Sequence, residues 1–333
     1  MPAYNNQSLT DMFKDKNKES SFLDFSPPES LVQGLAISSR ELAIEKGLNL
    51  NDLDSIAGVQ GLPPLQILKS LIEQLDDAHL IPDLHGLGIE LGAGLALLSI
   101  VLLERDTKRQ IDGILALEAV KPFVERGIQK AGAEILGERK GSLLPCFGIF
   151  ESIPVADETF DFALQIESLH HAEDLGVAVK ELSRILKIGG VVFSLDRSWI
   201  SSTKREVLDQ LLNHEYSKEW LAAKHFPLGD RFTRRDNGEH EYTDQHWIET
   251  FRDNGLVLKR IVHLNPKIEM WHVKKRLVTC LKLTSLLGVK IESRKGILRS
   301  WFNQTLKRKP KIHSNLMVSP HPRPLTLFVF AKE

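Results

Sequence analysis

The sequence is poor in cysteine and lacks a long hydrophobic run. Its 333 residues contain two cysteines, Cys146 and Cys280, which are far apart and therefore exclude a disulfide framework and a cysteine-rich zinc cluster. The longest strongly apolar run, 95–103, has about half of the roughly 20 residues that a membrane-spanning helix needs. No charged-then-apolar leader opens the chain, so a soluble, cytoplasmic protein is expected.

Histidines with metal-ligand spacing are also absent. None of the 12 histidines forms an H-x-x-x-H pair or a cluster with cysteine, and we predict no metal site. Net charge is nearly absent as well, with a formal value of −1. The charge is nevertheless segregated, because residues 266–313 contain thirteen Lys and Arg against two acids. This basic stretch could contact an anionic membrane surface, a phosphorylated substrate or nucleic acid, or it could be an amphipathic insertion that packs on the domain.

The chain divides by composition. Residues 1–20 are polar and are predicted to be a disordered tail. Residues 21–84 are predicted to be a helical extension, because apolar residues recur three and four apart in PPLQILKSLIEQL, 63–75. Residues 85–265 form the predicted core, 266–320 a basic insertion, and 321–333 the last strand of the core.

Strand and helix patterns alternate through the core. Strands are expected at 86–91, 111–117, 142–150, 160–166, 191–196, 256–264 and 325–333, and helices at 95–105, 120–136, 173–187 and 242–256. Gly189-Gly190 is expected to end the third helix, while Thr243 or Asp244 caps the fourth and Gly255 ends it. Such alternation predicts an α/β protein with a mostly parallel sheet covered by helices on both faces.

A glycine-rich turn follows the first core strand. Glu90, Leu91, Gly92, Ala93 and Gly94 stand where open parallel sheets bind ligands, and a helix follows them with its free N–H groups directed at the turn. A dinucleotide fingerprint would require a small residue where Leu97 stands. The alternative reading, Glu-x-Gly-x-Gly, is complete.

That pattern resembles motif I of the class I S-adenosylmethionine-dependent methyltransferases. The resemblance continues with Glu118 after the second strand and with the ordered marks Ile153-Pro154, Phe160-Asp161, Leu169-His170-His171, Glu181, Arg184-Ile185-Leu186 and Gly189-Gly190. It implies a Rossmann-like class I methyltransferase fold, in which a seven-stranded, mostly parallel sheet has an antiparallel last strand and is preceded here by the helical extension. It also implies S-adenosyl-L-methionine as the cofactor.

The resemblance assigns the cofactor residues. They are Glu90, Leu91, Gly92, Ala93, Gly94, Glu118, Ala119, Ile149, Phe150, Glu151, Gln165 and Ile166. Glu118 is expected to bind the two ribose hydroxyls.

Two positions depart from the family. Ala96 replaces a glycine, which we expect to be a mild change because alanine favours helix. Ile149 replaces the acid that contacts the adenine amino group, so apolar contacts of Ile149 and Phe150 are expected there, with Glu151 as a substitute acceptor.

Candidate catalytic residues follow the strands predicted at 160–166 and 191–196, and two more lie in a later segment. His170 and His171 could act as a general base, or they could only pack and cap the next helix. Asp196 and Arg197 could orient a substrate or form a surface ion pair. His240 and Tyr242, in NGEHEYTD, could face the substrate or lie in a solvated loop.

The expected reaction is methyl transfer to oxygen or nitrogen of a small molecule, with a glycan or lipid-linked precursor as one candidate. The amino-methylating DNA signature Asn/Asp-Pro-Pro-Tyr/Phe is absent at 165–168, and no nucleic-acid partner is expected. Residues 266–313 could make peripheral membrane contact. Two alternatives remain open, a nicotinamide-dependent oxidoreductase and a non-catalytic, membrane-associated module that binds the cofactor.

Overall fold

A computed structural model describes residues 4–14, 22–28, 65–223, 232–264 and 325–333. Its strands are β1 (Leu23–Asp24), β2 (Gly86–Leu91), β3 (Ile111–Glu118), β4 (Leu143–Phe147), β5 (Phe160–Ile166), β6 (Leu186–Arg197), β7 (Leu256–Leu264) and β8 (Leu325–Lys332). Its helices are α1 (Asn6–Lys14), α5 (Leu65–Asp77), α6 (Leu97–Arg105), α7 (Gln129–Leu136), α8 (Leu175–Ile185), α9 (Arg205–Leu212), α10 (Lys218–Ala223) and α11 (Asp244–Asp253). A π-helical segment (Phe123–Ile128) leads directly into α7, and short 3-10 turns lie at Gly137–Ser142 and Leu169–His171.

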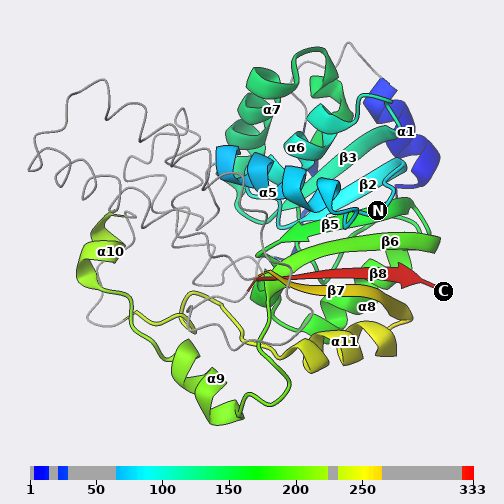
Figure 1. The fold of residues 1–333 in the computed structure, drawn as a ribbon. Helices are drawn as coiled ribbons and strands as arrows, with labels where there is room; N and C mark the ends of the chain where they lie inside the picture. Colours follow the sequence, from blue (N-terminus) through cyan, green and yellow to red (C-terminus); the bar gives the residue numbers. More distant parts are fainter. Residues whose placement is uncertain (1–3, 15–21, 29–64, 224–231, 265–324) are drawn as a thin grey trace, which may run out of the picture. The chain divides into compact units, whose positions relative to one another are not determined.

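The strands form one sheet in the order β1-β4-β3-β2-β5-β6-β8-β7 (Figure 1). The predicted Rossmann-like sheet, mostly parallel with an antiparallel last strand, is confirmed. It has eight strands in the described residues and not seven, because β1 adds a short parallel pairing to the outer side of β4. Strand order reverses between β2 and β5, and ligands of open α/β sheets bind at the carboxyl ends beside such a reversal.

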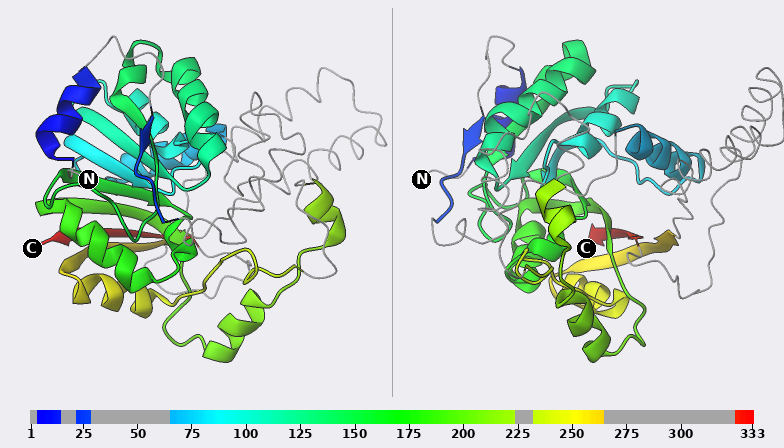
Figure 2. Two further views of the ribbon diagram at one scale, coloured as in Figure 1. Left: turned by 180° about the vertical axis from the view of Figure 1, so that it is seen from behind. Right: turned by 90° about the vertical axis from the view of Figure 1, so that its left-hand side faces the viewer.

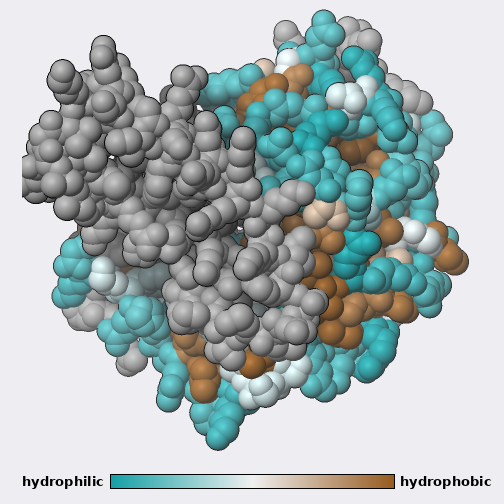
Figure 3. All heavy atoms as spheres, in the orientation of Figure 1, coloured by the Kyte–Doolittle hydropathy of each residue, from teal (hydrophilic) through white to brown (hydrophobic). Residues whose placement is uncertain are grey.

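Helices cover both faces of the sheet. Figures 1 and 2 show α5, α6 and α7 on one side and α8 with α11 on the other. The inner strands β2, β3 and β5 are almost continuously buried, which explains their runs of apolar residues. The outer strand β7 is half-buried, and Figure 3 shows hydrophobic side chains gathered over β7 and β8. In the parts of the chain that the structure describes, no helix combines the length and apolarity that a membrane crossing requires.

The structure describes residues 4–14 of the predicted disordered tail, 1–20, and these residues include a helix. Residues 6–14 form α1, whose Leu9 is fully buried in the core and whose Phe13 packs against Gly113 of β3. The backbone N–H of Tyr4 donates to the carbonyl of Pro154 at 3.1 Å. The polar composition of this segment does not reveal the helix, because only a few apolar residues share one of its faces.

Two helix ends test the local predictions. Thr243 caps α11 by accepting from the backbone N–H of His246, and Gly255 follows the helix with a φ of 80°, as predicted. Gly189 and Gly190, however, do not end α8. That helix stops at Ile185, and both glycines lie in β6, where Gly189 has a φ of 80°. The basic insertion, 266–320, and most of 21–64 lie outside the described residues.

Candidate functional site

The site forms at the carboxyl ends of β2, β3, β5 and β6. Glu90 pairs in register with Ala116 of β3 and Leu164 of β5, and Gln165 pairs with Ser194 of β6. Neighbouring parallel strands therefore end together and bring the predicted residues of four separate segments to one edge of the sheet.

Glu90 is enclosed beneath the glycine turn. Its carboxylate is fully buried, and one oxygen, Oε2, accepts from the backbone N–H of Ser99 at 3.1 Å and from the Ser99 hydroxyl. The other oxygen, Oε1, has no hydrogen-bond partner among the described residues. Burial raises the pKa of Glu90 to about 7, although the hydrogen bonds from Ser99 oppose the shift. This orphaned oxygen suits a cationic or donor group of a bound cofactor.

Glu118 holds the glycine turn from the neighbouring strand. Its Oε2 accepts from the backbone N–H of Gly94 at 2.6 Å, and its Oε1 accepts from that of Val120 at 2.8 Å. A carboxylate has two acceptor oxygens, and this chemistry suits the two hydroxyls of a vicinal diol. The contact places Glu118 beside the turn, as the predicted cofactor site requires.

The turn itself uses left-handed backbone conformations. Gly92 has a φ of 62° and Gly94 one of 57°. A Cβ on Gly92 would lie 2.5 Å from the Cβ of Ser168. The hydroxyl of Ser168 donates to the carbonyl of Leu91 at 2.7 Å. Ser168 thus fastens the loop after β5 to the glycine turn. Serines 99 and 168 were not among the predicted site residues, because nothing in the sequence distinguishes them from other buried serines.

Ala96, which we expected to be a mild replacement of glycine, adopts a left-handed conformation with φ 55° and ψ 32°. This conformation costs an L-residue about 1–2 kcal/mol. The high helix propensity of alanine is irrelevant here because the residue precedes the first turn of α6.

Replacing Ala96 with glycine is therefore expected to stabilise the protein by about 0.5–1 kcal/mol, since strain relief exceeds the added entropy of the unfolded chain. Thermal unfolding should show a rise of about 2 °C. Ala93→Gly is the matched control, because Ala93 lies in the same turn and is not among the residues with positive φ. A lower melting temperature for Ala96→Gly than for the wild type would contradict the strain argument.

The predicted adenine region is apolar. Ile149 is buried and Phe150 half-buried, and the aromatic ring of Phe150 approaches the position that a Cβ on Gly92 would occupy, at 3.1 Å. Glu151 lies farther along the chain, where its carboxylate accepts from the backbone N–H of Glu173 at 2.9 Å. Burial raises the pKa of Glu151. This hydrogen bond connects Glu151 to the segment before α8, so its carboxylate already accepts from a backbone N–H there.

His170 and His171 follow β5 and lie next to each other, with ring centroids 4.3 Å apart. Nδ1 of His170 lies 2.6 Å from Oδ1 of Asp196, and both side chains are buried. Nδ1 of His171 lies 3.1 Å from the carbonyl of Gly238. Gln165, beneath them, donates to the Ser194 hydroxyl. The structure thus joins His170 to Asp196, a pair that the sequence reasoning considered separately.

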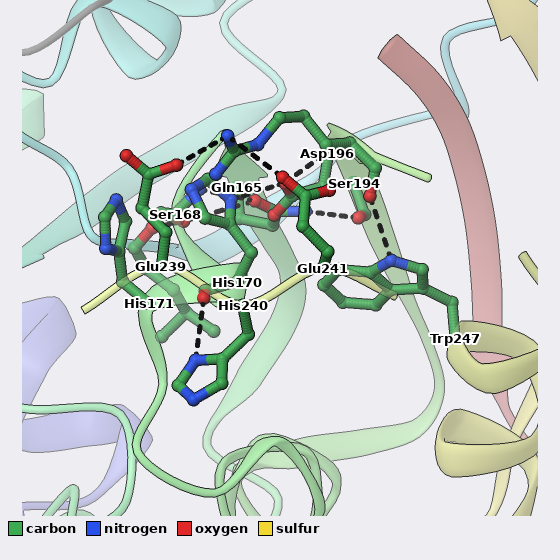
Figure 4. A network of polar contacts seen from close by, with 12 residues as sticks. Gln165, Ser168, His170, His171, Ser194, Asp196, Glu239, His240, Glu241 and Trp247 are labelled. Atoms are coloured by element: carbon green, nitrogen blue, oxygen red, sulfur yellow. Dashed lines mark hydrogen bonds and ion pairs between the residues drawn. The ribbon is translucent and has the colours of Figure 1, made fainter. Parts of the chain in front are cut away.

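A buried cluster of charges lies beside this pair. Figure 4 shows His170, Asp196, Glu239 and Glu241 in one polar network. Arg197 Nη1 donates to Glu239 at 2.7 Å, and Nε of Arg234 donates to the same carboxylate at 2.8 Å. Asp196 and Arg197 are 0% and 4% exposed, so the predicted alternative of a surface ion pair is wrong.

The segment NGEHEYTD is likewise not a solvated loop. Glu239 and Glu241 are buried, and the Tyr242 ring stacks on His246 with centroids 4.7 Å apart. The His240 backbone N–H donates to the carbonyl of His170 at 2.9 Å. Residues 232–242 therefore lie over the ends of β5 and β6. Within the described chain, no three His, Cys, Asp or Glu side chains are grouped so that they could hold a metal ion.

Comparisons with known proteins agree with this geometry. Residues 90–194 match the family model described as "Methyltransferase domain". The curated protein YafE of Escherichia coli, itself uncharacterised, is 45% identical over 49 residues, which are 15% of this chain and 24% of that protein.

Two solved structures are also similar. A sarcosine dimethylglycine methyltransferase from Galdieria sulphuraria, assigned provisionally, has 16% identity, covers 81% of this chain and 86% of its own, and gives a TM-score of 0.48. The second is a phosphoethanolamine N-methyltransferase from Haemonchus contortus, bound to phosphomonomethylethanolamine and S-adenosylhomocysteine. It is 10% identical, the match covers 88% of this chain and 59% of that one, and the TM-score is 0.48.

The matched segment starts at Glu90 and ends at Ser194, so it contains the glycine turn, Glu118 and both histidines. Residues 90–194 therefore form a methyltransferase domain, and the cofactor of such a domain is S-adenosylmethionine.

Proposed function

We propose that the protein transfers the methyl group of S-adenosylmethionine to an oxygen or nitrogen of a small molecule. The observation that carries the proposal is the pair of carboxylates on either side of the glycine turn, with Glu90 below it and Glu118 bonded to Gly94. In such an arrangement Glu118 binds the ribose hydroxyls and the unpartnered oxygen of Glu90 faces a donor group. When bound, the cofactor supplies an activated methyl group on a sulfonium.

The protein's own part is to orient the acceptor and take its proton. A hydroxyl or neutral amine becomes a better nucleophile when a general base is positioned beside it. His170 and His171 are the candidate bases, because they follow β5, two and three residues after Ser168, which contacts the glycine turn. A glycan or lipid-linked precursor is the acceptor class that we would test first, because residues 266–313 carry a large positive charge.

Replacing Glu118 with alanine is expected to weaken S-adenosylmethionine binding at least tenfold, because each lost charge-assisted hydrogen bond contributes about 1.5–3 kcal/mol. Calorimetric titration of the full chain measures the effect. Glu118→Gln is the intermediate variant, since its oxygen can still accept from one backbone N–H. Glu125→Ala, on the π-helical segment nearby, is the matched control and should bind as the wild type does. Unchanged affinity in Glu118→Ala would remove this residue from the cofactor site.

The acceptor is sought by incubating the protein with radiolabelled S-adenosylmethionine and a panel of hydroxyl- and amine-bearing small molecules, including free glycans and polyprenyl-phosphate-linked sugars. Label transferred to one class identifies the acceptor chemistry. NAD(H) is titrated in parallel, and binding of NAD(H) without S-adenosylmethionine would overturn the proposed function.

A further inference from the structure

We infer that Asp24 accepts a hydrogen bond from the exocyclic amino group of the cofactor's adenine, in place of the acid that Ile149 replaces. The inference rests on the proposed function, because it takes S-adenosylmethionine as the ligand, and it adds a binding residue from outside the predicted core. Asp24 lies on β1, whose two residues pair in parallel with the last two residues of β4. β1 therefore brings an acid to the edge of the sheet where the predicted adenine region begins.

Three residues stand in one row across the carboxyl edge of the sheet. Asp24 pairs with Phe147 of β4, and Phe147 pairs with Glu118 of β3. Residues paired in this way have their side chains on the same face of the sheet, and neighbouring strands lie about 4.8 Å apart. The row therefore places Asp24 about 10 Å from Glu118, the residue proposed to bind the ribose hydroxyls. This span is comparable to the length of an adenosine, so a cofactor whose ribose lies at Glu118 can reach Asp24 with the amino group of its base.

The contacts of Asp24 orient its carboxylate along this row. Oδ1 accepts from the backbone N–H of Ser26 at 2.7 Å, and Oδ2 lies 3.4 Å from Nζ of Lys121. Lys121 follows Glu118 by three residues, and its Nζ lies over the Phe147 ring, 5.3 Å from the centroid. The carboxylate thus faces the segment that follows the ribose-binding residue. The Asp24 side chain is 38% exposed, so a ligand can approach it.

The N-terminal segment is also bonded to the loop after β4. The backbone N–H of Phe25 donates to the carbonyl of Phe147 at 2.9 Å. The Phe25 ring packs against Gly148, where a Cβ would lie 3.2 Å from its Cδ2. Farther along the loop, the backbone N–H of Ala156 donates to the carbonyl of Tyr4 at 2.5 Å. These bonds hold Asp24 in a fixed position beside the predicted adenine region.

Glu151 is the rival acceptor, because it lies on the same loop. Its carboxylate accepts from the backbone N–H of Glu173, which follows β5. In the sheet order β1-β4-β3-β2-β5, Asp24 lies on the outer side of β4, whereas β5 lies beyond β2. The row that starts at Glu118 and passes through Phe147 therefore leads to Asp24 and not to Glu151.

Calorimetric titration of the full chain with two ligands tests the contact. One is S-adenosylhomocysteine, and the other is its analogue with unsubstituted purine as the base, which lacks only the amino group. The wild type should bind S-adenosylhomocysteine about tenfold more tightly or better, because the analogue loses a hydrogen bond to a charged acceptor. In Asp24→Ala the two affinities should agree within about twofold, since the partner of the amino group is gone. Asp24→Asn, whose amide oxygen still accepts, should retain part of the difference.

Two further variants identify the acceptor. Lys121→Ala removes the cation beside Asp24 but leaves its carboxylate, and Glu151→Ala removes the rival carboxylate. Both should show the same difference between the two ligands as the wild type. A wild-type difference in Asp24→Ala overturns the inference, and so does its loss in Glu151→Ala. A wild type that binds neither ligand overturns the proposed function, and with it the inference.

Discussion

Replacing Glu239 with alanine is expected to destabilise the protein by about 3–5 kcal/mol, the cost of leaving buried charges without their partner. Glu239 is 5% exposed and accepts from Arg197, Arg234 and Asn237, the last at 2.9 Å, as well as from the Tyr216 hydroxyl. Burial alone would raise the pKa of Glu239, but the charges of the two arginines outweigh it and hold that pKa well below its ordinary value.

The expected loss is large because two guanidinium groups remain. Arg197 and Arg234 also contact Glu241, which can neutralise only part of their charge. The free energy of unfolding, measured in urea, should fall further for Glu239→Ala than for Glu239→Gln, which retains hydrogen-bond acceptance. Glu333→Ala is the matched control, since Glu333 pairs with Lys259 at 2.5 Å on the surface with both side chains largely exposed. Surface pairs contribute about 0–1 kcal/mol, and equal losses at the two sites would contradict the argument.

Glu239 also shows why part of the site could not be predicted from the sequence. A run such as NGEHEYTD, with three charged or titratable residues in succession, is typical of a solvated loop. The charges are buried here because Glu239 pairs with Arg234, five residues earlier, and also with Arg197, which lies 42 residues away at the end of β6. The second pairing joins segments that are far apart in the sequence, so no periodicity within one segment could reveal it.

The core of the domain was predictable because its elements depend on residues that are close together in the sequence. Its strands and helices depend on local patterns, and β2, β3, β5 and β7 lie within one residue of the ranges predicted from apolar runs. The glycine turn was also predictable, because its conformations demand particular residues at Gly92 and Gly94. The conformation of Ala96 and the order of α1 were missed, since the first needs backbone angles and the second depends on packing of a few side chains such as Leu9.

Glu90 is expected to make the stability of the unliganded protein fall as pH rises. An unfolded chain releases the proton of this residue near pH 4.5, whereas burial in the folded protein raises its pKa to about 7. Between these values the folded state binds more protons than the unfolded state, so the free energy of unfolding decreases with pH. The contribution is fully present below pH 4.5 and is lost by about pH 7, and it amounts to roughly 3 kcal/mol.

Urea unfolding at pH 4.5 and pH 8 measures this contribution when wild type and Glu90→Gln are compared. The variant cannot ionise, and its amide oxygen can still accept from the backbone N–H and hydroxyl of Ser99. Asp196, whose pKa burial also raises to about 7, contributes in the same direction in both proteins and cancels in the comparison. An identical dependence on pH in wild type and variant would show that Glu90 does not titrate in this range.

The same titration should couple to the cofactor. S-adenosylmethionine is a cation, and a positive group placed near the unpartnered oxygen of Glu90 favours the ionised carboxylate. Binding then releases a proton below pH 7, so the affinity of the wild type should rise between pH 6 and pH 8, whereas that of Glu90→Gln should change little. Calorimetric titrations in two buffers of different ionisation enthalpy measure the released proton. Ionisation of Glu90 thus destabilises the unliganded protein, and cofactor binding should offset this loss. The reason is that the cofactor places a positive charge near a carboxylate that has no cationic partner in the described residues.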